Sequence, residues 1–338
     1  MRTLIVALII VAIAASPAVT QTHNLPIFEQ IFHSLYPNWA EMGARYAQVF
    51  PPFTERVRLV RSISVSPAGG GVENLSVPFP VPPNTPHQII HDLWPSHDDY
   101  EIIEARDGQK TLMILVGDLN PGETVVAGWE AEAEISRIIH PMDTLEQCVA
   151  YHLIPPEIHS RYTEDHPVYG INTPIVQEAA TFVLDQVNTY PEAVWMAYDL
   201  VSSEISYDHE RLADPASGAE ALDWGAGVCR HFSWSMIALC RAMGIPARHV
   251  SGGVIGGSEL HAWPEVYFPE YGWVSSDPTW GRRSSAHRAR RFGTLDSRCL
   301  VLTVGIEARE AVSRWTYRHT DRENPAQLEI EQMQVLSL

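Results

Sequence analysis

The chain has 338 residues, which is long enough for two domains of ordinary size. Hydrophobic residues make up 45% of it and charged residues 19%, and this composition excludes a largely disordered protein. The formal net charge of −18 would repel nucleic acids and anionic membrane surfaces, so we expect neither as a partner.

Residues 1–20 have the pattern of a secretory signal peptide. Arg2 supplies a positive charge, residues 4–15 form an apolar run, and residues 16–18 supply small side chains for cleavage. The apolar run is shorter than the roughly 20 residues that cross a bilayer, so we expect no stable membrane insertion after cleavage. The protein would then be periplasmic or secreted. A retained N-terminal anchor is the alternative, because the cleavage site is not a clean Ala-x-Ala sequence.

Residues 21–52 form a lead-in segment that is loosely helical until Pro51 and Pro52 stop it. Residues 53–142 then change to short β-type runs separated by turns rich in glycine and proline. This change in pattern predicts a small antiparallel β-sandwich domain over residues 53–142.

The pattern from residue 143 onward is first helical and then β-type again. Residues 175–187 and 193–205 place apolar side chains at helical spacing. Another helix is predicted from Cys229 until Gly244 ends it, and three strand-like runs follow. We therefore expect an α+β domain over residues 143–310 and a polar C-terminal tail over residues 311–338.

The four cysteines are too widely spaced for a metal or redox motif. Cys148 and Cys299 could form a disulfide in an oxidising compartment, although sequence does not fix connectivity. Cys240 lies on the apolar face of its predicted helix, as a small buried hydrophobe would. The histidines have no metal-ligand spacing either, so we expect neither a metal nor another cofactor.

Cys229, His261 and Asp277 are the candidate catalytic residues. Cys229 follows a glycine-rich approach and begins a helix, where the helix dipole and free backbone N–H groups favour a thiolate and could stabilise an oxyanion. His261 opens one predicted strand and Asp277 follows the next. Neighbouring antiparallel strands can hold such residues side by side and facing the helix, which would provide a nucleophile, a base and an orienting carboxylate.

Several stretches around these residues resemble the bacterial transglutaminase-like superfamily. They are residues 227–230, 238–242, 244–248, 261–267 and 277–279. The resemblance covers roughly residues 145–310, and the β-rich region before them resembles the N-terminal β domain of many such proteins. It implies a papain-like α+β core in which Cys229 is the nucleophile, His261 the general base and acid, and Asp277 the group that orients the imidazole.

Two positions depart from the family pattern. His231 stands where many relatives have an acidic residue, and we expect it to alter the charge near the thiol. Pro264 removes a backbone donor from the strand that opens at His261, so we expect this strand to lie at a sheet edge or to be bulged there. Neither change removes a catalytic group.

A basic cluster follows Asp277 and consists of Arg282, Arg283 and the arginines of residues 288–291. It could dock an anionic substrate segment or a cell-wall polymer, but we favour a solvated loop that pairs with an acidic surface. Four aromatic residues near the motif could line the substrate site. We expect them to pack instead, and they stay outside the catalytic set: Tyr207, Trp224, Trp263 and Trp273.

These features predict an exported, thiol-dependent acyl-transfer enzyme that acts on peptide or carboxamide bonds of a protein or peptide substrate. With water as the acceptor the enzyme would be a cysteine peptidase or amidase. We favour this reading because transamidation needs a site that excludes water. A protein-glutamine transglutaminase with an amine acceptor is one alternative, and a non-catalytic module that binds peptides or cell wall is another.

Overall fold

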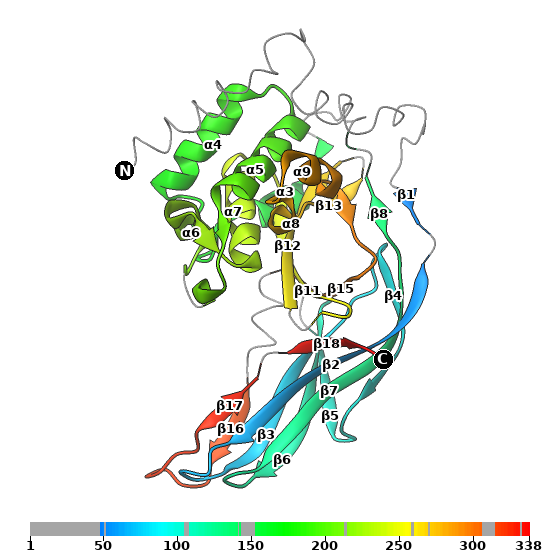
Figure 1. Ribbon diagram of the computed structural model, residues 1–338, viewed down its shortest axis with the longest axis vertical. Coiled ribbons are helices and arrows are strands. Elements are labelled where there is room, and N and C mark those ends of the chain that lie inside the picture. Colours follow the sequence, from blue (N-terminus) through cyan, green and yellow to red (C-terminus); the bar gives the residue numbers. More distant parts are fainter. Residues whose placement is uncertain are drawn as a thin grey trace.

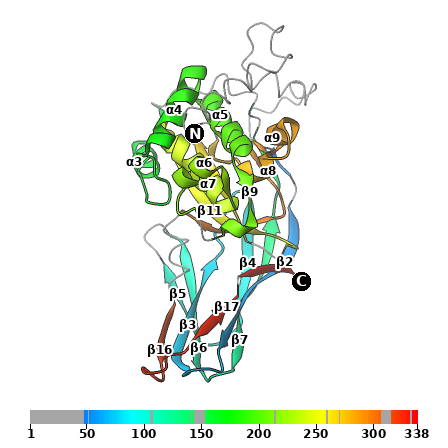
Figure 2. The same ribbon diagram turned by 60° about the vertical axis from the view of Figure 1, so that its left-hand side comes forward.

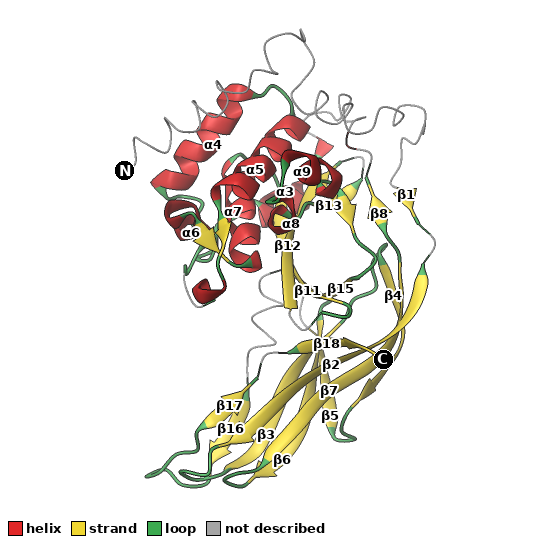
Figure 3. Ribbon diagram, viewed as in Figure 1, coloured by secondary structure: helices red, strands yellow, loops and turns green. Residues whose placement is uncertain are grey.

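The computed structural model describes residues 48–50, 52–104, 108–140, 142, 153–212, 215–257, 260–269, 271–305, 315–331 and 333–338. The predicted signal peptide, most of the lead-in segment and Cys148 lie outside these residues. The predicted α+β class is confirmed, because helices gather in one half of the molecule and the other half consists of strands (Figure 3). In the described part of the chain, no helix is long and apolar enough to cross a membrane.

The all-strand half is the predicted β-sandwich (Figure 1). One sheet has the strand order β16-β3-β6-β5, and the other has the order β17-β2-β7-β4 with β18 also paired to β2. Their long strands are β2 (Phe53–Val65), β3 (Val72–Val81), β4 (Gln88–Pro95), β5 (Tyr100–Glu104), β6 (Lys110–Leu119) and β7 (Thr124–Ile135). In β7, every second side chain from Ala127 to Ile135 is buried, as the two-residue period of a half-buried strand requires.

The C-terminal residues correct one expectation, because residues 311–338 are not a separate tail. β16 (Thr316–His319) pairs with β3, while β17 (Leu328–Ile330) and β18 (Gln334–Ser337) pair in succession along β2 (Figure 2). Val335 is fully buried in the sandwich core. Strands of three or four residues carry too short a hydrophobic pattern to be recognised without their partner strands.

The mixed half contains a four-stranded antiparallel sheet with helices packed against it. The sheet has the order β13-β12-β11-β15 and consists of β11 (Ala247–Val254), β12 (Leu260–Phe268), β13 (Gly272–Ser275) and β15 (Cys299–Val304). The helices are α3 (Pro156–Tyr162), α4 (Pro174–Gln186), α5 (Tyr190–Glu204), α6 (Gly218–Trp224), α7 (Cys229–Ala242), α8 (Pro278–Gly281) and α9 (Ser285–Arg291). Short ladders link these elements: β9 (Ser206–Tyr207) pairs with β10 (Ala226–Gly227), and β8 (Ile138–Ile139) joins β1 (Gln48–Val49) to β14 (Thr294–Leu295).

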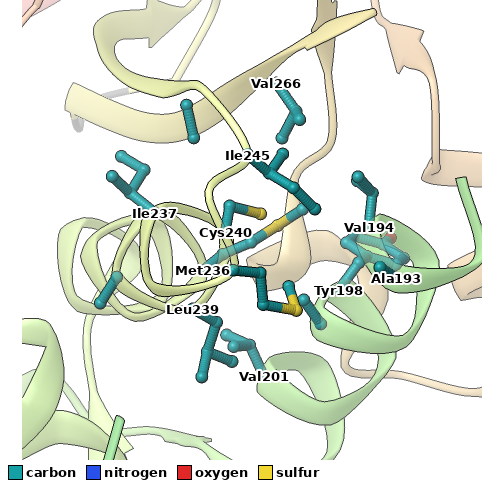
Figure 4. Packing of buried hydrophobic residues seen from close by; sticks show 14 of the residues in the cluster. Ala193, Val194, Tyr198, Val201, Met236, Ile237, Leu239, Cys240, Ile245 and Val266 are labelled. Atoms are coloured by element: carbon teal, nitrogen blue, oxygen red, sulfur yellow. The ribbon is translucent and has the colours of Figure 1, made fainter. Parts of the chain in front are cut away.

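Helix α7 is the centre of the mixed half. Figure 4 shows Met236 and Cys240 of α7 packed among side chains of α5, such as Val201, and the residues that follow α7, such as Ile245. The Cys240 side chain is fully buried, as predicted for a small hydrophobe, and burial raises the pKa of its thiol to about 12. The helix that begins at Cys229 is therefore fixed by a tightly packed core.

Two glutamines attach the edge strand β15 to the sandwich. Gln88 accepts a hydrogen bond from the Val301 N–H (2.7 Å) and donates one to the Val301 carbonyl (2.9 Å). Gln109 donates to the Leu302 carbonyl at 3.4 Å. Leu300 and Leu302 of the same strand join the sandwich core. Side chains thus satisfy backbone groups that an edge strand would otherwise leave exposed, and they hold the two halves together.

We predict that Val335→Asp destabilises the whole protein, because the change places a carboxylate in the sandwich core. The free energy of unfolding, measured by urea denaturation, should fall by about 3 kcal/mol or more. Leu338→Asp is the matched control, since Leu338 is 53% exposed and should tolerate the same charge. Equal stability of the two variants would contradict the role of the C-terminal strands in the core.

Candidate active site

Cys229 is the first residue of α7, where the sequence places it. The preceding strand β10 ends at Gly227, and Val228 has extended backbone angles before the helix begins. A Cβ atom on Gly227 would lie 2.7 Å from the Cβ of His231. Only glycine therefore permits the chain to enter the helix this closely, and the thiol of Cys229 is placed at the positive end of the helix dipole.

His231 has a structural role that its sequence position did not reveal. Its ring is fully buried, and Nδ1 accepts a hydrogen bond from the Val228 N–H at 3.0 Å. The side chain thus satisfies a backbone donor just before the first turn of α7, as the side chain at this position of a capping box does. The structure thus adds a role in shaping the start of the helix to the expected effect of His231 on the charge near the thiol, which stays a prediction.

His261 and Asp277 form a buried pair. The Nε2 atom of His261 lies 2.6 Å from Oδ2 of Asp277, and the two residues are 8% and 6% exposed. The antiparallel pairing of β12 with β13 brings them together, with Glu265 opposite Ser275. The other carboxylate oxygen of Asp277 accepts the backbone N–H of Thr279 (2.9 Å) at the start of α8. Each oxygen of this carboxylate therefore has its own partner.

The Cys229 thiol completes the set of three predicted residues. Burial disfavours the charged form of His261, but the charge and hydrogen bond of Asp277 and a hydrogen bond with Cys229 outweigh it and raise the pKa of His261 to about 10. Because Nε2 is occupied by Asp277, Nδ1 is the ring atom left for the thiol. The raised pKa favours the protonated form of the ring, and a positive charge beside a thiol favours its thiolate form.

Pro264 does not place its strand at an edge or in a bulge, contrary to expectation. β12 is a central strand and keeps a continuous register with β11, in which His249 faces Pro264. The Ser276 N–H donates to the Pro264 carbonyl at 3.1 Å, and the paired residues of the β12–β13 ladder begin at Glu265. The backbone N–H that proline lacks would point to the side of β13, as the Pro264 carbonyl does. Because the β12–β13 ladder ends here, the missing donor interrupts no further pairing.

Trp280 is a site residue that the sequence analysis missed. Its ring stacks on the His261 imidazole, with centroids 5.0 Å apart and planes at 10°. On the same ring, the guanidinium of Arg291 lies 4.6 Å from the centroid. The sequence feature that could have identified Trp280 is its position three residues after Asp277, one turn into the short helix that Asp277 caps. This placement fixes the plane of the imidazole.

The four aromatic residues set aside in the sequence analysis have different surroundings. Trp263 is buried, with its ring 5.8 Å from that of His261, whereas Trp224 is 47% exposed. Tyr207 and Trp273 each lie under an arginine side chain, Arg282 and Arg248 respectively. None of these four rings stacks on His261 as Trp280 does.

No metal-binding cluster is present among the described residues, where no three His, Cys, Asp or Glu side chains are grouped to hold an ion. Cys299 is buried and carries a free thiol. Its proposed disulfide partner, Cys148, is outside the described residues.

The His261–Asp277 pair predicts a pH-dependent stability. The pKa of His261 is raised from 6.5 to about 10 in the folded protein, so its stabilising effect is fully present below pH 6.5 and is lost as the pH rises through 10. Between these pH values, the free energy of unfolding measured by urea denaturation should fall for the wild type. The fall should be on the order of 3 kcal/mol larger than the fall for His261→Gln. His209→Gln removes an exposed histidine and should keep the wild-type slope. Parallel slopes for all three proteins would contradict the prediction.

Comparison with known sequences matches residues 178–278 to the Transglutaminase-like superfamily. The protein-glutamine gamma-glutamyltransferase of Pseudomonas aeruginosa is 37% identical over 121 residues, which cover 29% of this chain and 17% of that protein. The uncharacterized protein YebA of Bacillus subtilis is 34% identical over 103 residues, which cover 24% of this chain and 14% of that protein. The chain thus spans less than a fifth of either relative.

Comparison with solved structures shows a shared fold. A candidate cysteine protease from Cytophaga hutchinsonii superposes with a TM-score of 0.64 at 16% identity, over 86% of this chain and 93% of that one. Coverage of this extent includes both the sandwich and the mixed half. The matched segment holds the helix that begins at Cys229 and the strands that carry His261 and Asp277. The chain therefore contains a transglutaminase-like domain built on a papain-like α+β core.

Proposed function

We propose that the protein is a thiol-dependent acyl-transfer enzyme that acts on peptide or carboxamide bonds, with Cys229 as the nucleophile. The observation that carries the proposal is the 2.6 Å contact between His261 Nε2 and Asp277, which leaves Nδ1 for the Cys229 thiol. This is the arrangement that a nucleophile, its base and an orienting group require. Residues 1–20 support an activity outside the cytoplasm, in the periplasm or the medium.

The reaction would begin with attack of the Cys229 thiolate on the carbonyl carbon of the substrate. The first backbone N–H groups of α7 have no partners within the helix, so they can donate to the oxyanion that forms. Collapse of this intermediate breaks the C–N bond, and His261 gives its proton to the leaving amine. A thioester on Cys229 remains. Asp277 holds the imidazole in place and stabilises its charged form throughout these steps.

The acceptor that resolves the thioester decides the class of enzyme. Cys229 is partly exposed, so solvent reaches the thiol, and we favour water and hence a cysteine peptidase or amidase. His261 would take the proton from this water as it attacks. An amine acceptor, which gives a protein-glutamine transglutaminase, is the second candidate because the Pseudomonas aeruginosa relative carries that name. Both routes share the same first half-reaction.

Labelling of thiols tests the nucleophile. Iodoacetamide at neutral pH should alkylate Cys229 and leave Cys240 and Cys299 unmodified, because burial raises the pKa of both of these thiols. Peptide mapping by mass spectrometry identifies the alkylated residue. Cys229→Ala should abolish the alkylation that mapping assigns to residue 229, with any alkylation of Cys148 scored separately, and Cys240→Ala should leave the alkylation of Cys229 unchanged. An inert Cys229, together with no cleavage of peptides and no amine incorporation, would leave only a non-catalytic binding module.

Analysis of the acyl product formed from a glutamine-containing peptide, with and without a primary amine, separates the two acceptors, because both routes release the same ammonia. Hydrolysis predicts a glutamate product whether or not the amine is present, and transamidation predicts incorporation of the amine at the expense of glutamate. Cys229→Ala is the control for both products.

Asp277→Asn tests the orienting carboxylate. Loss of the negative charge should lower the pKa of His261 and reduce the rate constant of acyl transfer roughly hundredfold or more, while the amide oxygen can still accept the Thr279 N–H. The rate of Cys229 alkylation as a function of pH should change as well. Asp223→Asn removes the same charge from an exposed position of α6 and should have no effect. A wild-type rate in Asp277→Asn would exclude this role.

A further inference from the structure

An unusual concentration of positive charge follows the catalytic aspartate. The chain has 41 acidic residues against 23 lysines and arginines, yet residues 282–298 contain six arginines and one acidic residue, Asp296. The segment was expected to be a loop, but residues 285–291 of it form helix α9. Helix α9 follows α8 directly, and α8 is capped by Asp277. The positive charge is therefore held on ordered elements beside the site.

Only some of these arginines are neutralised by acidic neighbours. Arg288 pairs with Asp199 (2.6 Å), and Arg291 pairs with Asp296 (3.2 Å). In contrast, Arg282, Arg283 and Arg290 are exposed, and none of them has a carboxylate partner within the described part of the chain. The expected pairing with acidic residues thus accounts for Arg288 and Arg291, the inner arginines. It leaves Arg282, Arg283 and Arg290, the outer arginines, without an acidic partner among the described residues.

The outer arginines lie close to one another. Their common neighbour is His287. Its pKa is lowered first by burial and then by the charges of four arginines: Arg291, Arg283, Arg290 and Arg282. His287 on α9 thus lies in the combined positive field of arginines from α9 and from the connection between α8 and α9. Guanidinium groups gathered in this way, without acidic partners, recognise carboxylates well, since each one can donate two parallel hydrogen bonds.

The cluster touches both sides of the candidate active site. On the histidine side, Arg291 lies over Trp280, which stacks on His261. On the thiol side, the Arg282 guanidinium lies 4.8 Å from the ring centroid of Tyr207. Tyr207 pairs with Gly227, two residues before Cys229. A substrate that places its carbonyl between Cys229 and His261 would therefore extend next to these arginines.

We propose that Arg282, Arg283 and Arg290 select peptide substrates that carry acidic side chains close to the reacting carbonyl. The inference rests on the proposed function of Cys229 and deepens it by naming a substrate class. We assign a peptide rather than an anionic polysaccharide, because the neighbouring thiol reacts with acyl groups of amides and an acidic side chain on the same chain can reach the arginines. In a protein of net charge −18, this local positive field also counteracts the general repulsion of acidic substrates.

Charged and neutral alkylating reagents test the field without knowledge of the natural substrate. Iodoacetate is an anion and iodoacetamide is neutral, and both alkylate the same thiol. Arg283→Gln/Arg290→Gln should lower the iodoacetate-to-iodoacetamide rate ratio at Cys229 about three- to tenfold at low ionic strength, and added salt should narrow the difference. Arg318→Gln/Arg322→Gln removes two exposed arginines from the sandwich half and should leave the ratio unchanged. Arg282 is kept because it also packs on Tyr207.

Competition with peptides then tests the substrate class. Two glutamine-containing hexapeptides, identical except that one carries two glutamates and the other two lysines, are used to slow iodoacetamide labelling of Cys229. The acidic peptide should protect the wild-type thiol more than the basic peptide does, and this preference should be much smaller in Arg283→Gln/Arg290→Gln, which keeps only Arg282 of the three arginines. Equal protection by both peptides, or protection by dextran sulfate alone, would overturn the proposal.

The two proposals fail in different ways. If iodoacetamide does not label Cys229 in the wild type, the proposed acyl-transfer function fails. If labelling is normal but the reagent ratio is the same in wild type, in Arg283→Gln/Arg290→Gln and in Arg318→Gln/Arg322→Gln, only the assignment of acidic substrates fails.

Discussion

The buried contact between His261 and Asp277 is the constraint on which the site depends. A charged carboxylate is stable at 6% exposure only when its oxygens have partners, and here they are His261 and the first N–H groups of α8. This requirement explains why a four-residue helix follows the aspartate directly. The helix in turn places Trp280 against the imidazole. One carboxylate thus positions the imidazole of His261, caps α8 and, through α8, places the Trp280 ring.

The sequence revealed the order of the site more readily than its surroundings. Cys229, His261 and Asp277 stand at recognisable points, at a helix start, a strand start and a strand end, and the structure brings them together. Trp280 was missed, and His231 was singled out without its structural role, because both roles depend on which ring or backbone group lies next to the residue in space. A hydrophobic period tells which face of a helix is buried, but it does not tell which ring stacks on which.

The same distinction applies to the fold. Long strands such as β2 and β7 alternate clearly between buried and exposed residues and were predictable, whereas β16, β17 and β18 become strands only because β2 and β3 offer them open edges. Pro264 shows the converse case. A rule about strand interiors predicted an edge or a bulge, but the neighbouring ladder ends at this residue and its missing donor interrupts no further pairing.

The C-terminal strands also determine when the protein can finish folding. β2 is made early, but two of the strands that pair with it, β17 and β18, are synthesised only after the whole mixed half. The β2 edge of its sheet therefore keeps unpaired backbone donors and acceptors until the ribosome has completed the mixed half and the strands that follow it. Unpaired strand edges favour association with other chains. A chain truncated before residue 328 would accordingly be prone to aggregate through β2.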